Sequence, residues 1–303
     1  MDSTVYWFML PVCVAIAAVA MFSGISGAAL LIPVFLVGFP LLGVPRLTTI
    51  EAVGTSLLLE TSGFGTGVVR YMRLRLVDTA TARRIIAVTL PLGAIGAIAA
   101  RHAPVQALRL GYGAAMLGLA WLLSRHTDGN HGDQPAPALV ADTDRAHSAC
   151  GHGQERHVQA ANGTTYDFCA HGLAIQRLLS GAGAFVAGLI STGVGEATLP
   201  PLVRRSRFPV PVAAATSTVI VAGTVVGAAA THLVQLAADG GLSAIPWNLI
   251  VWAVPGAIIG AFTGTRLQGR ISERATRLFF TALFAAIGIT FLAAFTVFRH
   301  RFT

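Results

Sequence analysis

Charged residues are scarce in this sequence. They make up 11% of the 303 residues, whereas hydrophobic residues make up 54%. A soluble domain carries about a quarter charged residues, so most of this chain is expected to lie in lipid. The net charge of +8 does not indicate a nucleic-acid partner, because the arginines stand in short clusters at the ends of apolar runs. Such clusters orient membrane helices instead.

Signals of several other protein classes are also absent. The three cysteines give no even disulfide framework, so we expect them to be reduced. Residues 1–22 contain Asp2 but no Lys or Arg, so they lack the basic start of a cleavable signal, and we expect this segment to be retained. No GxxxxGK[ST], GxSxG or HExxH motif is present. We therefore expect neither an ATP-driven pump nor an enzyme, and no cofactor.

Long apolar runs dominate what remains. A transmembrane helix needs roughly 20 mostly apolar residues. Two apolar regions, 5–42 and 178–203, are interrupted by glycine and serine at 23–27 and 191–195, and each predicts a hairpin of short helices. The sequence thus predicts an all-α polytopic membrane protein. Uninterrupted runs that meet or approach the spanning length cover 47–69, 83–100, 108–124, 209–233, 246–265 and 277–298.

The two broken regions match each other at a constant offset, which indicates an internal duplication. We expect one transmembrane repeat in 1–125, a second in 178–303, and a polar linker in 126–177. The pairs at that offset are Ser23 with Ser191, Gly27 with Gly195 and Pro33 with Pro201. With small slips, the match continues in Val44-Pro45 with Val210-Pro211, Thr55-Ser56 with Thr216-Ser217, and Pro91-Leu-Gly-Ala-Ile-Gly96 with Pro255-Gly-Ala-Ile-Ile-Gly260.

The arginine clusters predict how the repeats sit, because loops rich in Lys and Arg stay in the cytoplasm. Clusters at 70–84, 204–207 and 266–277 mark cytoplasmic ends. In each repeat, the hairpin returns the chain to the side where it began and the three spans then carry it to the other side. The second repeat therefore starts on the opposite side and is inverted relative to the first. Both termini lie outside and the linker lies inside the cell inner (plasma) membrane, although Arg299 and Arg301 at an outer C-terminus run against the rule.

The linker carries two Cys-x-His pairs, Cys150 with His152 and Cys169 with His171. Thiolate and imidazole are suitable zinc ligands, and Asn162-Gly163 between two short runs predicts a β-hairpin that would bring the pairs together. Cys-x-His is not a standard zinc spacing, however, and linkers of this kind are usually only solvated. We therefore expect no metal, with these four residues as the candidates if one binds.

The two breaks predict a binding site. Non-helical backbone in a bilayer is tolerated only where it is buried in protein or lines a cavity. Half-helices that start near Ala28 and Glu196 would direct free N–H groups and positive dipole ends at the breaks, which favours an anion. The alternative is that Gly and Ser merely let helices pack closely. Recurrence of the pattern in both repeats favours the site.

Hydroxyl and carboxyl groups add to this prediction. The Thr55-Ser56 and Thr216-Ser217 pairs would complete an oxyanion cage, unless they bond back to their own helices. Carboxylates inside spans cost a few kcal/mol and are functional candidates by default. Glu196 directly follows the second break and suggests proton coupling or gating, or else a charged helix cap. The other candidates for this role are Glu60, which lies mid-span, and Glu51, which lies where it would reach water.

Several motifs resemble the TauE/SafE family of sulfite exporters. They are Phe22-Ser-Gly-Ile-Ser-Gly-Ala-Ala-Leu-Leu-Ile-Pro33, Ala52-Val-Gly-Thr-Ser56, Gly188-Leu-Ile-Ser-Thr-Gly-Val-Gly-Glu-Ala-Thr-Leu-Pro200 and Ala213-Ala-Ala-Thr-Ser217. The resemblance implies secondary transport of small sulfur-containing anions, most simply export of sulfite or an organosulfur anion. The long linker departs from shorter family members. The substrate-binding positions implied are Ser23, Gly24, Ser26, Gly27, Thr55, Ser56, Ser191, Thr192, Gly193, Gly195, Thr216 and Ser217.

We therefore expect a transporter that binds a sulfur anion where the breaks meet, with proton coupling left open. Two alternatives remain: an anion channel, and a membrane-embedded sensor that works through the linker. The expected partners are the anion and the lipid bilayer, with no nucleic acid. Small residues on several spans would permit a homodimer.

Overall fold

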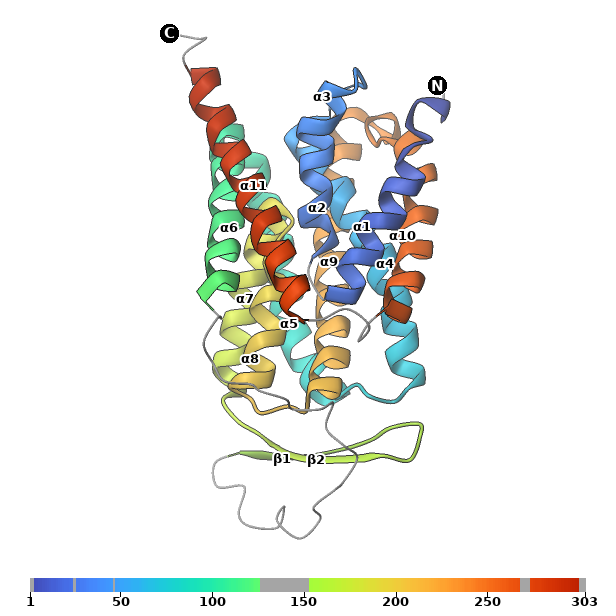
Figure 1. The fold of residues 1–303 in the computed structure, drawn as a ribbon, viewed down its shortest axis with the longest axis vertical. Helices are drawn as coiled ribbons and strands as arrows, with labels where there is room; N and C mark the ends of the chain where they lie inside the picture. The colour runs from blue at the N-terminus through green and yellow to red at the C-terminus, as the bar shows by residue number, and fades with distance from the viewer. Residues whose placement is uncertain (1–2, 24–25, 46, 126–152, 268–272, 300–303) are drawn as a thin grey trace.

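The computed structural model describes residues 3–23, 26–45, 47–125, 153–267 and 273–299. Helices dominate these residues, which confirms the all-α class (Figure 1). The first part of the chain forms η1 (Ser3–Tyr6), α1 (Met9–Ser23), α2 (Gly27–Pro33), the π-helical η2 (Val34–Gly38), α3 (Phe39–Leu41), α4 (Thr49–Arg73), α5 (Thr79–His102) and α6 (Val105–Arg125). The last part forms α7 (Leu173–Ile190), α8 (Val194–Arg204), α9 (Val210–Gly240), η3 (Leu242–Ala244), α10 (Trp247–Leu267) and α11 (Glu273–Arg299).

Four helices of the described part are long and apolar enough to cross a membrane: Thr79–His102, Leu173–Ile190, Val210–Gly240 and Trp247–Gly264. The other runs predicted as uninterrupted spans coincide with α4, α6 and α11. The first arm of the second break, α7, is long enough to span by itself, so it is not the short helix that we expected.

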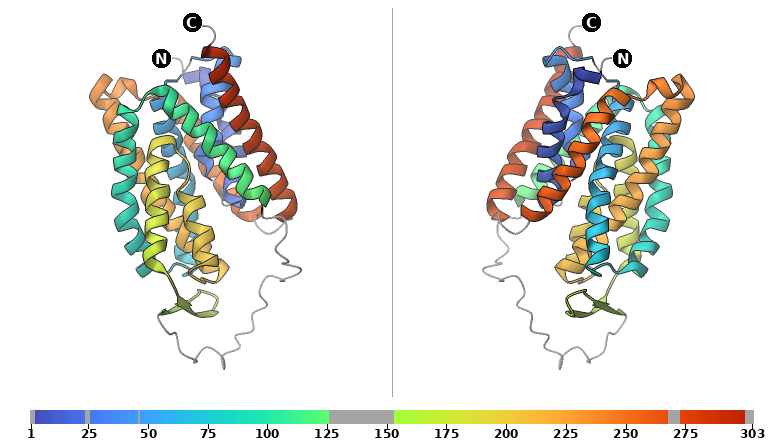
Figure 2. Two further views of the ribbon diagram at one scale, coloured as in Figure 1. Left: turned by 90° about the vertical axis from the view of Figure 1, so that its left-hand side faces the viewer. Right: turned by 90° about the vertical axis from the view of Figure 1, so that its right-hand side faces the viewer.

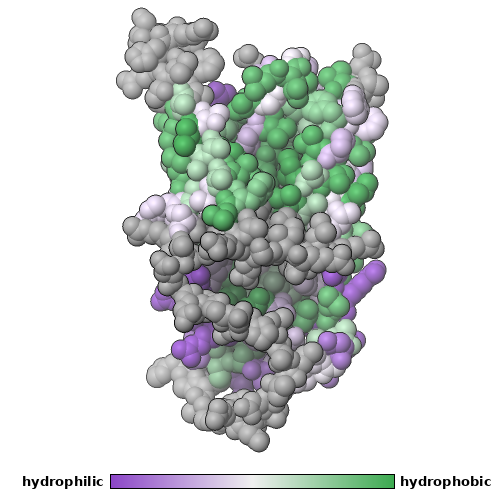
Figure 3. Space-filling model, viewed as in Figure 1, coloured by the Kyte–Doolittle hydropathy of each residue, from purple (hydrophilic) through white to green (hydrophobic). Residues whose placement is uncertain are grey.

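The outer surface of the helices is apolar. Leu178 is 72% exposed and Val234 is 68% exposed, although both lie in apolar helices. Figure 3 shows hydrophobic residues over the helices on one face, with hydrophilic residues gathered toward the end that carries the linker hairpin. Apolar side chains in such number fit contact with lipid rather than water.

Capping groups determine where α4 and α5 begin. The Thr48 hydroxyl accepts from the Glu51 N–H at 3.2 Å, and the Glu51 carboxylate accepts from the Thr48 N–H at 2.7 Å. This reciprocal pair is a capping box. At the start of α5, the Asp78 carboxylate accepts from the N–H groups of Ala80 and Thr81, both at 3.2 Å. Glu51 thus serves as the helix cap of α4.

Helices of the first half of the chain pair with helices of the second half, an arrangement that we call exchanged pairing. Helix α1 packs on α10 and α7 packs on α5, while α4 pairs with α9 and α6 pairs with α11. The repeated Pro/Gly segments make the first two contacts. A Cβ atom at Gly96 would lie 2.2 Å from the Phe185 carbonyl oxygen, and one at Gly260 would lie 2.3 Å from the Val14 carbonyl oxygen. Only glycine fits such a close approach. Both copies of the Pro/Gly segment therefore make the same kind of close helix–helix contact.

Helices α1 and α7, the first arms of the two broken hairpins, run in opposite directions along the bundle. Helix α1 begins at the end where α11 finishes, whereas α7 begins at the opposite end, beside the linker hairpin (Figures 1 and 2). The corresponding hairpin arms of the two halves therefore enter the bundle from opposite ends.

The described part of the linker forms a two-stranded antiparallel hairpin, β1 (Gln154–Gln159) and β2 (Thr165–Ala170). The chain reverses at Asn162-Gly163, where Gly163 has a φ of 84°. The hairpin packs against the bundle. Val158 is buried with Leu202 of α8, and the Phe168 ring lies 4.6 Å from that of Phe208, between α8 and α9.

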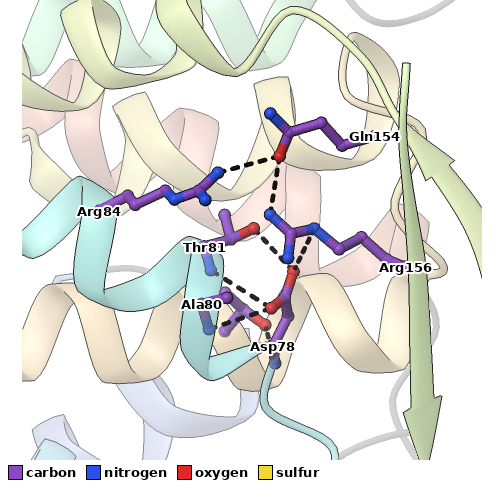
Figure 4. A network of polar contacts seen from close by, with 7 residues as sticks. Asp78, Ala80, Thr81, Arg84, Gln154 and Arg156 are labelled. Carbon is purple, nitrogen blue, oxygen red and sulfur yellow. Dashed lines mark hydrogen bonds and ion pairs between the residues drawn. The ribbon is translucent and has the colours of Figure 1, made fainter.

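Polar contacts also hold the hairpin to the start of α5 (Figure 4). Arg156 of β1 forms an ion pair with Asp78, with 3.6 Å between Nε and Oδ2. Gln154 Oε1 accepts from both Arg84 and Arg156 at 2.9 Å. Since Asp78 also caps α5, the hairpin is fixed to the bundle and does not hang free.

Candidate functional site

The two interruptions of the helical hairpins lie in contact. The Ser26 hydroxyl donates to the Ser191 carbonyl oxygen, and the Ser26 N–H donates to Glu196 Oε1, both at 3.4 Å. Both distances are at the long end for hydrogen bonds. Ser26 immediately precedes α2, whereas Ser191 and Glu196 belong to the segment from the end of α7 to the start of α8. The breaks therefore converge inside the bundle.

The second break depends on unusual backbone angles. Ser191 ends α7 with a φ of 65°, and its N–H donates to the Ala187 carbonyl oxygen at 2.7 Å. A left-handed conformation is uncommon for a residue other than glycine. Gly193 precedes α8 with a φ of 119°, which favours glycine at that position. These angles turn the chain sharply and leave Ser191 facing the first half of the molecule.

A pair of serine hydroxyls joins this break to α4. The Oγ atoms of Ser56 and Ser191 are 2.8 Å apart, and both residues are fully buried. Each hydroxyl also reaches the Val53 carbonyl oxygen, Ser56 at 2.9 Å and Ser191 at 3.4 Å. Ser56 thus bonds back to its own helix and also contacts the second break.

Two carboxyl groups face the N–H groups of the breaks. The Glu196 carboxyl interacts with the N–H of Gly193 and with its own N–H, as well as with that of Ser26. The Glu60 carboxyl, from the middle of α4, faces the Ser26 hydroxyl and the N–H groups of Gly27 and Ala28, and it interacts electrostatically with Glu196. Protein carboxyl groups thus stand where the sequence predicts an anion.

Each of these two carboxyl groups has one oxygen without a hydrogen-bond partner among the described residues. Glu60 is 5% exposed and its Oε1 has no hydrogen-bond partner in the described part of the chain. The same holds for Oε2 of Glu196. A buried carboxyl without full pairing is costly. The two groups are therefore well suited to hold a proton or to respond to a ligand.

A cavity lies beside the first break. Its empty volume is about 340 Å³, including the part open to solvent. Gly27 and Glu60 line it together with apolar side chains of α1, α2, α4 and α10, among them Met21 and Phe64. Among the residues that the structure describes, Glu60 is the one charged residue that lines this cavity. Gly27, at the end of the first break, therefore borders a small hollow whose lining is mostly apolar.

The hydroxyls of α9 lie in other surroundings. Thr216 Oγ1 accepts from the Asp78 N–H at 3.0 Å, so it contacts the connection between α4 and α5. The Ser217 hydroxyl bonds back to the Ala214 carbonyl oxygen at 3.0 Å. Thr55 and Thr192 are buried, and the hydroxyl of each is without a hydrogen-bond partner among the described residues.

Some predicted residues lie outside the described residues: Gly24, Cys150 and His152, as well as the side chain of Ser23. Cys169 is disulfide-bonded, which corrects the expectation that all cysteines are reduced and removes its thiolate as a metal ligand. The ring Nδ1 of His171 lies 2.8 Å from the Cys169 carbonyl oxygen. Within the ranges that the structure describes, no cluster of three or more His, Cys, Asp or Glu residues could hold a metal ion.

His232 was not predicted from the sequence as a functional residue. It lies on α9, is fully buried, and its Nε2 is 2.9 Å from the carbonyl oxygen of Gly188, shortly before the second break. The signal was present, because His232 is the one histidine within a predicted span. An imidazole in a membrane helix is a functional candidate by default.

Comparison with known proteins identifies the family. A search of the curated proteins and a search of the solved structures each found no match. The family model described as sulfite exporter TauE/SafE matches residues 9–291, nearly the whole chain. That family comprises membrane exporters of sulfur anions, in accord with the apolar helices. The chain is therefore an integral membrane protein that belongs to the TauE/SafE sulfite exporter family.

Proposed function

We propose that this protein is a secondary transporter that exports sulfite or a related organosulfur anion through the point where the two breaks meet. The observation that carries the proposal is the contact of Ser26 with Ser191 and Glu196. It brings together the hydroxyl and N–H donors of both halves, which are the groups that bind oxyanions without requiring a metal. Family membership supports the class of substrate.

The two carboxyl groups support coupling to protons. An anion that reaches the N–H groups of the breaks meets Glu196 and Glu60 at the same place. Two like charges about 4 Å apart repel by about 4 kcal/mol at an effective dielectric constant near 20. A proton on one carboxyl group removes that repulsion and releases N–H donors for the anion. Protonation and anion binding therefore favour each other, and the two ions move together.

The inferred arrangement is a pair of inverted repeats in the inner membrane, with the linker hairpin in the cytoplasm. The opposite directions of α1 and α7 and the exchanged pairing of α1 with α10 and α7 with α5 support the inversion. The arginine-rich ends of α4 and α8, near Arg70 and Arg204, support the cytoplasmic assignment. The site between the two breaks then opens alternately to the two sides of the membrane.

Flux measurements in proteoliposomes test the proposal. The purified protein should carry sulfite with saturable kinetics, and the flux should respond to a pH gradient. Ohmic sulfite currents would identify a channel instead. Lack of sulfite flux by the protein alone, with intact linker, would favour the sensor. A binding screen with sulfite, sulfate, thiosulfate, taurine and sulfoacetate would then establish which anion fits.

A further inference from the structure

The His232 imidazole forms a hydrogen bond that reaches the end of α7. Its imidazole is 0% exposed. Nε2 lies 2.9 Å from the Gly188 carbonyl oxygen, while Nδ1 has no hydrogen-bond partner in the described part of the chain. A carbonyl oxygen only accepts, so Nε2 carries the proton and donates it. The side chain therefore acts as a donor to α7.

The acceptor lies in the last turn of that helix. The last four carbonyl groups of a helix lack intrahelical partners. The Ala187 carbonyl accepts from the Ser191 N–H, and the Gly188 carbonyl accepts from His232. His232 thus supplies from α9 a bond that the end of α7 cannot make for itself. Ser191 follows directly in its left-handed conformation, so the anchored turn determines where its hydroxyl lies.

The same histidine also packs against α4. A Cβ atom at Gly54 would lie 3.0 Å from the Cβ of His232, so the two backbones approach closely. Gly54 follows Val53, whose carbonyl accepts both hydroxyls of the serine pair, and lies two residues before Ser56. His232 therefore contacts both segments that carry the pair, α4 through Gly54 and α7 through Gly188.

We propose that His232 is a positioning residue that fixes the distance between the hydroxyls of Ser56 and Ser191, and thereby sets the affinity of the site for the anion. This inference rests on the proposed function, since it takes the serine pair as part of the anion site. His232 itself does not touch the anion. Loss of its bond to Gly188 lets the last turn of α7 shift, and the Ser191 hydroxyl then moves away from Ser56.

Transport kinetics of four variants in proteoliposomes test the inference. His232→Met removes the donor at similar volume and should raise the KM for sulfite about tenfold, the order expected for one buried hydrogen bond, with little change in kcat. His232→Gln keeps an N–H donor at similar reach and should restore most of the affinity. Gly54→Ala places a methyl group against the His232 side chain and should also raise the KM for sulfite. Thr231→Val is the matched control, because that hydroxyl donates to the Gly227 carbonyl oxygen of its own helix.

A double-mutant cycle distinguishes positioning from general packing. If His232 acts through Ser191, His232→Met should change KM little once Ser191 is alanine. An equal effect in both backgrounds, or an unchanged KM in His232→Met, would overturn the inference. Should His232→Met fail to fold, Gly54→Ala in the two backgrounds decides by the same criterion. Absence of sulfite flux in the parent protein would instead overturn the proposed function, and this inference with it.

Discussion

The backbone N–H of Ser26 donates to Oε1 of Glu196 across 3.4 Å, and so joins segments 170 residues apart in the chain. The carboxylate of Glu196 thereby lies between the two breaks and interacts with N–H groups from both. An anion drawn to the same groups must share them with this carboxylate or displace it.

Replacement of Glu196 by glutamine tests the link between protons and anions. Glutamine keeps the size of the side chain and removes the charge that repels the substrate. Sulfite binding should become tighter at alkaline pH and nearly independent of pH, and flux should lose its response to a pH gradient. Glu51→Gln is the control, because Glu51 caps α4 and should not affect the pH dependence. An unaltered pH profile in Glu196→Gln would contradict the coupling.

Replacement of Ser191 by alanine tests the hydroxyl pair. The variant loses the contact with Ser56 and one donor to the anion. Sulfite affinity should fall about tenfold, the order of one hydrogen bond to a charged group. Ser62→Ala is the matched control, since its hydroxyl donates to the Leu59 carbonyl oxygen of its own helix. Equal affinity of Ser191→Ala and the parent by calorimetry would exclude this hydroxyl from the site.

Alanine at Gly96 or Gly260 should destabilise the fold. Each added Cβ atom would lie near 2.2 or 2.3 Å from a backbone oxygen of the neighbouring helix. Forced overpacking of this kind costs about 1–3 kcal/mol. Gly118→Ala is the control, because its added Cβ meets no atom within 4 Å. Thermal unfolding in detergent should show lower midpoints for the first two variants alone, and equal midpoints for all three would contradict the exchanged pairing.

The ion pair of Arg156 with Asp78 should hold the linker hairpin to the bundle. Arg156→Gln leaves the Asp78 carboxylate without its cation, at a cost of about 1–3 kcal/mol. Limited proteolysis should then cut the hairpin faster, while sulfite flux is retained. His157→Gln alters only an exposed contact with Asp167 of β2 and should change the cleavage rate little. Abolished flux in Arg156→Gln would contradict this expectation and show that transport depends on the hairpin.

Hydropathy and spacing predicted the helices and the two breaks, because lipid as solvent imposes a simple rule on length and composition. The rotation of each helix could not be predicted in this way. Glu60 faces the first break and Thr216 faces Asp78 because of how α4 and α9 pack, and no local pattern encodes that. The role of His232 depends likewise on a contact between distant helices.

The most direct measurement is calorimetric titration of the purified protein with sulfite in buffers of different ionisation enthalpy. The account predicts saturable sulfite binding with net proton uptake by the parent protein, weakened binding in Ser191→Ala, and no proton uptake in Glu196→Gln. Sulfite binding without proton uptake by the parent, or with the same affinity and uptake in all three proteins, would contradict it.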